Sequence, residues 1–136
     1  MKIALDEKAI MPERAHAEDA GLDLFAPEDA VVPAGGCCVI DTGVHVEIPI
    51  GYVGMLKSKS GLNVKHDIVS EGVIDCGYTG SIVAKLYNHG KYDYEIYRGD
   101  KITQLVIMPC ITPALELVDM LAETERGSGG FDSTGK

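Results

Sequence analysis

Short stretches in which apolar and polar residues alternate, or in which apolar residues run together, follow one another along most of the chain. In residues 43–48, the apolar Val44, Val46 and Ile48 are separated by His45 and Glu47, which is the period of a half-buried β-strand. Comparable stretches lie at residues 22–25, 37–40, 52–56, 81–88, 94–97 and 101–108. The pattern predicts many short strands.

Proline and glycine separate these stretches, for example at Pro33, Pro49, Gly99 and Pro113. Short strands divided by turn residues are typical of an all-β sandwich, jelly roll or barrel. One short helical turn is expected in residues 60–66, where Ser60 could cap it. We expect a single domain over residues 1–136. Its β body would end at residue 125, and residues 126–136 would form a flexible arm because four of them are glycine.

The composition limits the partners of the chain. Twenty-one acidic residues against twelve Lys and Arg give a net charge of −9, which argues against nucleic acid or an anionic membrane as a partner because both require a basic face. A small anionic substrate would therefore need a divalent cation or a locally basic pocket. No apolar run resembles a signal peptide or membrane span. No two of the four cysteines form a Cys-x-x-Cys pair, so we expect reduced thiols and a cytoplasmic protein, or a nuclear one in a eukaryote.

Two segments in the first half carry candidate chemistry. Asp23, in AGLDLF, could place a carboxylate at the rim of a pocket to hold a metal-bound water, although Asp after Gly is also ordinary turn chemistry. In KSKSGL, the side chains of Lys59 and Ser60 and the backbone of Gly61 could bind a polyphosphate. A solvated lysine-rich loop explains that segment equally well.

Two later segments place polar groups beside apolar strands. In GVIDCGYTG, Asp75 could act as a general base on water while Tyr78 stacks on a sugar or base. Asp and Tyr beside glycines also decorate ordinary hairpins. Gln104 interrupts a buried strand and must find hydrogen-bond partners, which could be a catalytic water or a neighbouring backbone group.

The C-terminal RGSGGFDSTG holds groups suited to a nucleotide. Arg126, Ser133 and Thr134 could reach phosphate oxygens, and Phe131 could lie against a flat ring. The alternative is a glycine-rich linker with one stray aromatic residue.

Taken together, AGLDL, KSGL, GVIDCGYTG, GDKITQL and RGSGGFDSTG, in this order between residue 20 and the C-terminus, resemble the motifs of the trimeric deoxyuridine triphosphatases (dUTPases). The resemblance implies a β jelly roll that forms a homotrimer with three active sites between subunits. One chain would supply the first, second and fourth motifs, a second chain the hairpin, and the third chain the C-terminal arm as a lid.

The resemblance also implies an activity. A dUTPase hydrolyses dUTP to dUMP and pyrophosphate, which limits uracil in DNA and supplies dUMP for thymidylate synthesis. Asp75 would activate the water that attacks the α-phosphorus, Mg²⁺ would bind the triphosphate, and Asp23 would hold metal-bound water. The residues implied in substrate binding are Lys59, Ser60, Gly61, Gly72, Ile74, Tyr78, Gln104, Arg126, Phe131, Ser133 and Thr134.

Four residues depart from the family pattern. Lys59 and Lys101 stand where the family usually has arginine. The ammonium of lysine offers a point charge in place of the bidentate contact that a guanidinium can make. The residue at position 101 would then be a candidate for a structural ion pair. Thr103 replaces alanine, and Asp132 replaces a glycine and adds negative charge beside the phosphate-binding end of the arm.

Two other functions remain compatible with the motifs. One is a dCTP deaminase-related enzyme, which would need a serine-arginine pair that this chain does not supply beside Glu71. The other is a regulatory or binding protein of the dUTPase fold with weak or no catalysis. Pyrophosphate release separates the active enzyme from the binding protein.

Overall fold

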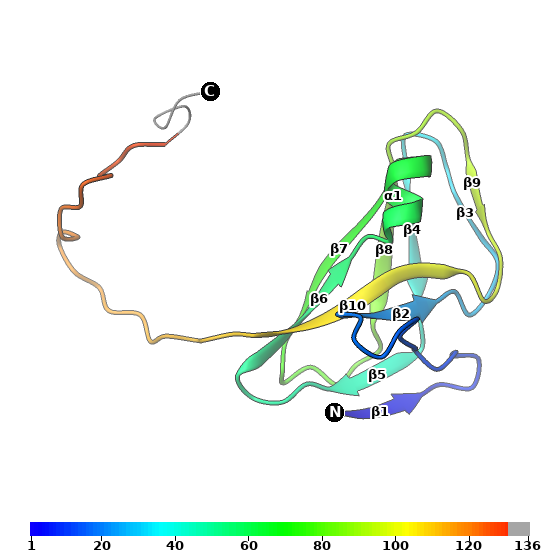
Figure 1. Ribbon diagram of the computed structural model, residues 1–136, viewed down its shortest axis with the longest axis horizontal. Helices are drawn as coiled ribbons and strands as arrows, with labels where there is room; N and C mark the ends of the chain where they lie inside the picture. Colours follow the sequence, from blue (N-terminus) through cyan, green and yellow to red (C-terminus); the bar gives the residue numbers. More distant parts are fainter. Residues whose placement is uncertain (131–136) are drawn as a thin grey trace.

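The computed structural model describes residues 1–130 of the chain. These residues form an all-β fold with one short helix (Figure 1). The elements are β1 (Lys2–Leu5), β2 (Gly21–Phe25), β3 (Ala30–Val32), β4 (Cys37–Asp41), β5 (Val44–Glu47), β6 (Tyr52–Lys57), α1 (Ser60–His66), β7 (Ile68–Ile74), β8 (Val83–Asn88), β9 (Tyr94–Ile96) and β10 (Lys101–Pro109).

The strands build one large curled sheet and two small ones. The large sheet has the order β2-β10-β6-β7-β8-β4, and the pairs β1-β5 and β3-β9 flank it. Strand β7 changes partner half-way: Ile68–Ser70 pair with β8, whereas Glu71–Ile74 pair with β6. This change of partner curls the sheet onto itself, which produces the jelly-roll-like architecture.

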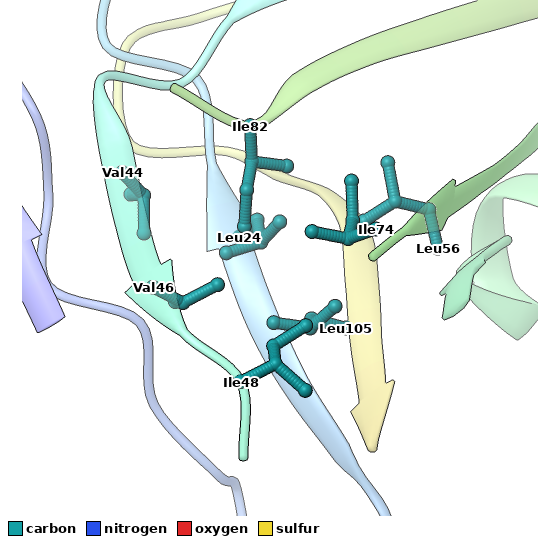
Figure 2. Close-up of a cluster of buried hydrophobic side chains, with 8 residues drawn as sticks. All are labelled: Leu24, Val44, Val46, Ile48, Leu56, Ile74, Ile82 and Leu105. Carbon is teal, nitrogen blue, oxygen red and sulfur yellow. The ribbon is translucent and has the colours of Figure 1, made fainter. Parts of the chain in front are cut away.

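Two clusters of buried side chains fill the interior. The first contains Leu24, Val44, Val46, Ile48, Leu56, Ile74, Ile82 and Leu105, which converge from five strands and the segment before β8 (Figure 2). The second contains Ala26, Val32, Ile40, Ile68, Ala84, Leu86, Ile96 and Ile102. The apolar residues of the alternating pattern therefore point inward and form the core, as expected for strands whose successive side chains point to opposite faces.

A bulge in β10 lets one strand serve both clusters. Between Lys101 and Thr103 the pairing with β2 shifts by one residue, so that the adjacent Ile102 and Thr103 are both buried. Ile102 joins the second cluster and Leu105 joins the first. If this bulge were absent, Thr103 would lie opposite Asp23 in place of Gln104. A slip of one residue moves every following side chain to the other face.

The helix forms where the sequence predicted it, but its cap differs. Lys59 is the N-cap residue and makes no side-chain capping hydrogen bond, while Ser60 is already the first helical residue. The expectation that Ser60 caps the helix is therefore wrong. The helix ends at Asp67, which adopts a left-handed conformation with a φ of 55° and donates its N–H to the Asn63 carbonyl.

The chain after β10 leaves the body of the fold. Residues 110–130 run away from the sheets without regular structure (Figure 1), and their large apolar side chains are exposed, Leu115 at 98% and Leu117 at 100%. No helix within the described part of the chain is long and apolar enough to cross a membrane.

Truncating Leu105 to alanine should lower the free energy of unfolding by about 2–5 kcal/mol, because Leu105 is 1% exposed and its removal leaves a cavity in the first cluster. Val64→Ala is the control, since Val64 is 82% exposed on α1, and it should change the stability by less than about 0.5 kcal/mol. Urea unfolding at one fixed protein concentration measures both. Equal effects would contradict the packing described here.

Candidate active site

Three of the sequence motifs meet in one row across the large sheet. Gln104 of β10 is paired with Asp23 of β2 on one side and with Lys57 of β6 on the other. Directly paired residues project their side chains to the same face. The row therefore places the first and fourth motifs beside Lys57, from which the chain continues into Lys59, Ser60 and Gly61 of the second motif.

A buried carboxylate joins this row to two lysines. Asp23, whose side chain is 4% exposed, pairs through Oδ1 with the Lys59 ammonium and through Oδ2 with Lys101 Nζ at 3.0 Å. Lys101 also pairs with Glu13 Oε1 at 3.2 Å. One carboxylate thus connects β2, the loop after β6, and β10.

The charges of Asp23, Lys59, Lys101 and Glu13 shift the pKa values of Asp23 and Lys101. Burial by itself raises the pKa of Asp23, but the hydrogen bonds and charges of Lys59 and Lys101 outweigh it, and the net pKa is lowered. The hydrogen bonds to Asp23 and then to Glu13 raise the pKa of Lys101. Both groups are therefore charged at neutral pH.

Gln104 is held in a fixed orientation. Its Nε2 donates to the Ser58 carbonyl at 2.9 Å. A Cβ on Gly21 would lie 2.1 Å from Gln104 Oε1, so a larger residue at position 21 would displace this side chain. The Gln104 Oε1 atom therefore lies against Gly21 of β2.

The loop that carries Ser60 and Gly61 is fastened to β7. Ser58 Oγ accepts the Ser70 N–H at 2.9 Å and donates to the Ser70 carbonyl at 3.2 Å. Ser60 and Gly61 follow at the start of α1, and both are exposed. Their polar groups are therefore open to a ligand that enters beside Gln104.

The segment between β7 and β8, residues 75–82, carries the other candidate residues. Asp75 is exposed, and its carbonyl accepts the Tyr78 N–H at 3.0 Å in a tight turn. The Tyr78 hydroxyl donates to the Ser81 carbonyl at 2.9 Å, and the ring lies so close over Gly80 that a Cβ there would be 2.4 Å from the hydroxyl oxygen. The ladder between β7 and β8 ends at Ser70 and Leu86, so the two strands separate well before this hairpin turns.

The structure separates Asp75 from the Asp23 row of the same chain. Lys57 is paired with Glu71 of β7, and Asp75 lies four residues further along that strand direction. At a rise of about 3.3 Å per residue, Asp75 is about 13 Å from the row. The candidate residues of one chain therefore fall into two groups, at opposite ends of the β6–β7 pair.

The remaining predicted residues lie in different surroundings. Ile74 is 8% exposed with its side chain in the first core cluster, so only its backbone is available to a ligand. Gly72 is paired with Leu56. Arg126 lies on the segment that leaves the body, where its Nε donates to the Gly129 carbonyl at 3.0 Å. Phe131, Ser133 and Thr134 lie outside the described residues.

The comparisons with known proteins agree on one family. The family model named dUTPase matches residues 7–135. The deoxyuridine 5'-triphosphate nucleotidohydrolase of Gloeothece citriformis is 44% identical over 134 residues, which covers 96% of this chain and 92% of the relative. The chain belongs to the dUTPase family. The rat protein of the same name is 42% identical and covers 98% of this chain, although this chain spans 66% of that relative.

Solved dUTPase structures share the fold. The dUTPase of Staphylococcus bacteriophage 80alpha with dUpNHpp aligns at a TM-score of 0.92 with 36% identity, covering 99% of this chain and 98% of that one. That structure belongs to work on phage dUTPases that control the transfer of virulence genes. A mutant dUTPase of phage phi11, in which a structural Mg(II) ion is coordinated, aligns at 0.81 with 37% identity over 88% of this chain and 96% of that one.

Two of the lysines that depart from the dUTPase pattern share one partner. Lys59 and Lys101 both contact Asp23, so the expected ion pair at position 101 is present. Sequence reasoning missed Glu13, which pairs with Lys101 and forms an isolated backbone bridge with Asp23. Glu13 lies in the irregular segment between β1 and β2, before the first motif, and no local pattern marks it.

The carboxylates of this dUTPase chain do not form a metal cage. Within residues 1–130, no group of three His, Cys, Asp or Glu side chains is placed to hold a metal ion. Asp23, the one buried carboxylate within the described residues, has both oxygens engaged by lysines. These residues fit a cation whose ligands are substrate oxygens and waters rather than one held by protein side chains.

Asp23→Asn should lower the free energy of unfolding by about 1–3 kcal/mol at neutral pH, because two ammonium groups lose their charged partner. Since the folded-state pKa of Asp23 is lowered, this advantage of the natural protein is complete above the unfolded value of about 4 and decreases as the pH falls through the folded value. Urea unfolding from neutral to acidic pH measures the difference between the two proteins.

The exposed Asp119 supplies the control for this titration. Asp119→Asn should differ little from the natural protein across the same pH range. A stability difference for Asp23→Asn that stays constant into the acidic range would contradict the ion pairs described above.

Proposed function

We propose that this chain is a dUTP diphosphatase that hydrolyses dUTP to dUMP and pyrophosphate. The observation that carries the proposal is the row in which Asp23, Gln104 and the Lys59 loop of three separate motifs meet. Membership of the dUTPase family and the likeness to a dUTPase with bound dUpNHpp support it. In the cell, this reaction would limit uracil in DNA and supply dUMP for thymidylate synthesis.

Asp75 is the proposed general base. Its exposed carboxylate takes a proton from a water molecule while the water oxygen forms a bond to the α-phosphorus. The bond between that phosphorus and the bridging oxygen to the β-phosphorus breaks, and the electron pair leaves on pyrophosphate. The role of the protein in such a displacement is mainly to position the reactants and to stabilise charge.

Binding of the nucleotide divides between the two parts of the site. Lys59, Ser60, Gly61 and Gln104 would bind the phosphates from the Asp23 row. Tyr78 would pack against the deoxyribose and exclude a 2′-hydroxyl, and the backbone at Gly72 and Ile74 would read the uracil edge. Exclusion by crowding needs few special side chains, which suits the plain sequence of the hairpin.

Residues 126–136 are the proposed closing arm of the single domain, with residues 1–125 as its body. Arg126, Ser133 and Thr134 would hold the terminal phosphate, and Phe131 would stack on the uracil. The ordering cost of such an arm is met only when nucleotide is bound.

A divalent cation, Mg²⁺ in our proposal, accompanies the substrate. Lys57 pairs with Glu71, and Lys59 and Lys101 pair with Asp23 and Glu13, so the three lysines are matched by three carboxylates. The site therefore has little net charge with which to neutralise a triphosphate. A bound cation supplies that neutralisation, and Asp23 would orient the waters around it.

A homotrimer is the proposed assembly, with each site shared between subunits. The distance between Asp75 and the Asp23 row within one chain supports it, because a second copy can bring the missing hairpin. Exposed apolar side chains give further support: Val39 of β4, Val73 of β7 and Val83 of β8, and Leu115 and Leu117 after β10. The four free thiols, all within residues 1–130, support a reducing compartment such as the cytoplasm.

A regulatory role is the second candidate, and the likeness to the 80alpha dUTPase favours including it. In this alternative the chain binds dUTP with weak or no hydrolysis. Pyrophosphate release from dUTP, dTTP, dCTP and UTP with Mg²⁺ separates the two. The enzyme should release pyrophosphate from dUTP at least about 100-fold faster than from the others, whereas binding without release would support the regulatory protein.

Asp75→Asn should lower kcat for dUTP by about 100-fold or more, because general-base catalysis contributes that much, while the Kd for dUTP changes little. Asp67→Asn is the matched control, since Asp67 lies at the other end of β7 and its left-handed backbone suits asparagine. Steady-state kinetics and equilibrium binding measure both proteins. Unchanged turnover in Asp75→Asn would remove Asp75 as the base.

Deletion of residues 126–136 should leave a folded trimer with kcat/KM reduced by about 100-fold or more, because the closing groups are lost. Sedimentation gives the assembly state and pyrophosphate release gives the activity. Deletion of residues 135–136 alone is the control and should behave as the full chain. Normal hydrolysis by the longer deletion would refute the arm.

A further inference from the structure

The hairpin at residues 75–82 is anchored along one side by residues 41–45. The backbones are joined by Ile82 N–H to the Val44 carbonyl at 2.8 Å and by Thr42 N–H to the Ile82 carbonyl at 3.0 Å. The Ser81 hydroxyl donates to the Asp41 carboxylate. These contacts fix the side of the hairpin that leads into β8.

His45 makes the contact closest to the turn itself. Its Nδ1 lies 2.9 Å from the Thr79 carbonyl oxygen, and its Nε2 lies 3.3 Å from Asp6 Oδ1. Thr79 directly follows Tyr78, whose hydroxyl is bonded to Ser81. The imidazole therefore links the N-terminal segment to the part of the hairpin that carries the sugar-packing ring.

Both neighbours of this imidazole accept hydrogen bonds. A carbonyl oxygen and a carboxylate oxygen can be satisfied together only when both ring nitrogens carry protons. The ring is 28% exposed, so it keeps contact with solvent and exchanges protons freely. The geometry selects the imidazolium.

The other charges around His45 do not oppose this form. Asp6 follows β1, which is paired with β5, and Asp41 lies at the end of β4; both are acidic and favour a cation. Lys2 of β1 is paired with Glu47 of β5 at 2.8 Å, so its charge is matched by a neighbour. The hydrogen bonds to Thr79 and Asp6 are the main causes that raise the pKa of His45.

We propose that His45 is a positioning residue of the reaction: in its protonated form it holds the turn of the hairpin against the body, and this orients Tyr78 and Asp75 toward the nucleotide. The inference rests on the proposed dUTP hydrolysis. It adds a residue outside the five motifs, in strand β5.

The inference fixes the direction of the pH dependence. As the pH rises through the raised pKa of His45, Nε2 loses its proton and faces the Asp6 carboxylate as a second acceptor. The ring then loses one of its two supports and holds Thr79 less firmly. Hydrolysis should therefore weaken toward alkaline pH through the loss of this anchor.

Three variants separate the ring's charge from its hydrogen bond. His45→Asn keeps an N–H donor near the position of Nδ1 but cannot titrate. His45→Leu removes both. Asp6→Asn keeps an acceptor for Nε2 without the negative charge, so His45 should lose its proton at lower pH. His89→Asn is the matched control, because His89 lies after β8 and contacts the helix end rather than the hairpin.

The first measurement is kcat/KM for dUTP with Mg²⁺ from about pH 6 to about pH 9, the range in which a raised histidine titrates. The ratio of the natural protein to His45→Asn cancels effects of substrate and metal ionisation. That ratio should fall by about three- to tenfold as the pH rises. The ratio of Asp6→Asn to His45→Asn should show the same fall with its midpoint at lower pH. The ratio of the natural protein to His89→Asn should show no such fall. A ratio that is constant with pH would overturn the proposal.

The second measurement does not depend on catalysis. Amide hydrogen exchange of residues 75–82 at neutral pH should be faster by about three- to tenfold in His45→Leu, and the rate in His45→Asn should lie between that of His45→Leu and the natural rate. Unchanged exchange in His45→Leu would overturn the anchoring. If the natural protein releases no pyrophosphate from dUTP at any pH while exchange in His45→Leu is faster, the anchoring is supported and the proposed function fails.

Discussion

The arrangement of the site depends on a single buried carboxylate. Asp23 lies almost entirely out of water, and such a charge is costly unless partners satisfy it. Lys59 and Lys101 provide those partners from different parts of the chain. The same requirement draws β2, the loop after β6 and β10 together. The ion pairs that compensate the buried charge of Asp23 therefore also bring three motifs side by side. Loss of either lysine would leave part of that charge without compensation.

The route of β6 and β7 keeps the candidate residues of one chain in two separate groups. The antiparallel ladder runs from Lys57 and Glu71 at one end to Gly54 and Ile74 at the other. A ladder is stiff along its length and cannot fold back to bring Asp75 to Lys57. In the proposed trimer, a second copy would supply the hairpin, and activity would then depend on assembly.

The fold was predicted from the sequence where burial alone decides it. The alternation of Val44, Val46 and Ile48 gave a strand with those residues in the core. Strands β1, β3 and β7 were missed. Strands β1 and β3 are too short to show a clear hydrophobic pattern. In β7 the polar Ser70 is buried while Val73 is exposed, so the apolar residues do not mark its inner face. The expected cap at Ser60 was wrong by one residue, because Lys59 still has an extended backbone and is the N-cap, whereas Ser60 is already helical.

The sequence by itself determined the all-β class, the candidate motifs and the family resemblance, because strand periodicity and short motifs are local properties that survive without a structure. Only the tertiary structure decided that Gln104 lies opposite Asp23, that Lys101 and Glu13 belong to the same charge group, and that His45 supports the hairpin at Thr79. These facts depend on a one-residue bulge, on strand order and on side chains far apart in the sequence. No local pattern encodes such register, because the packing of the whole sheet sets it.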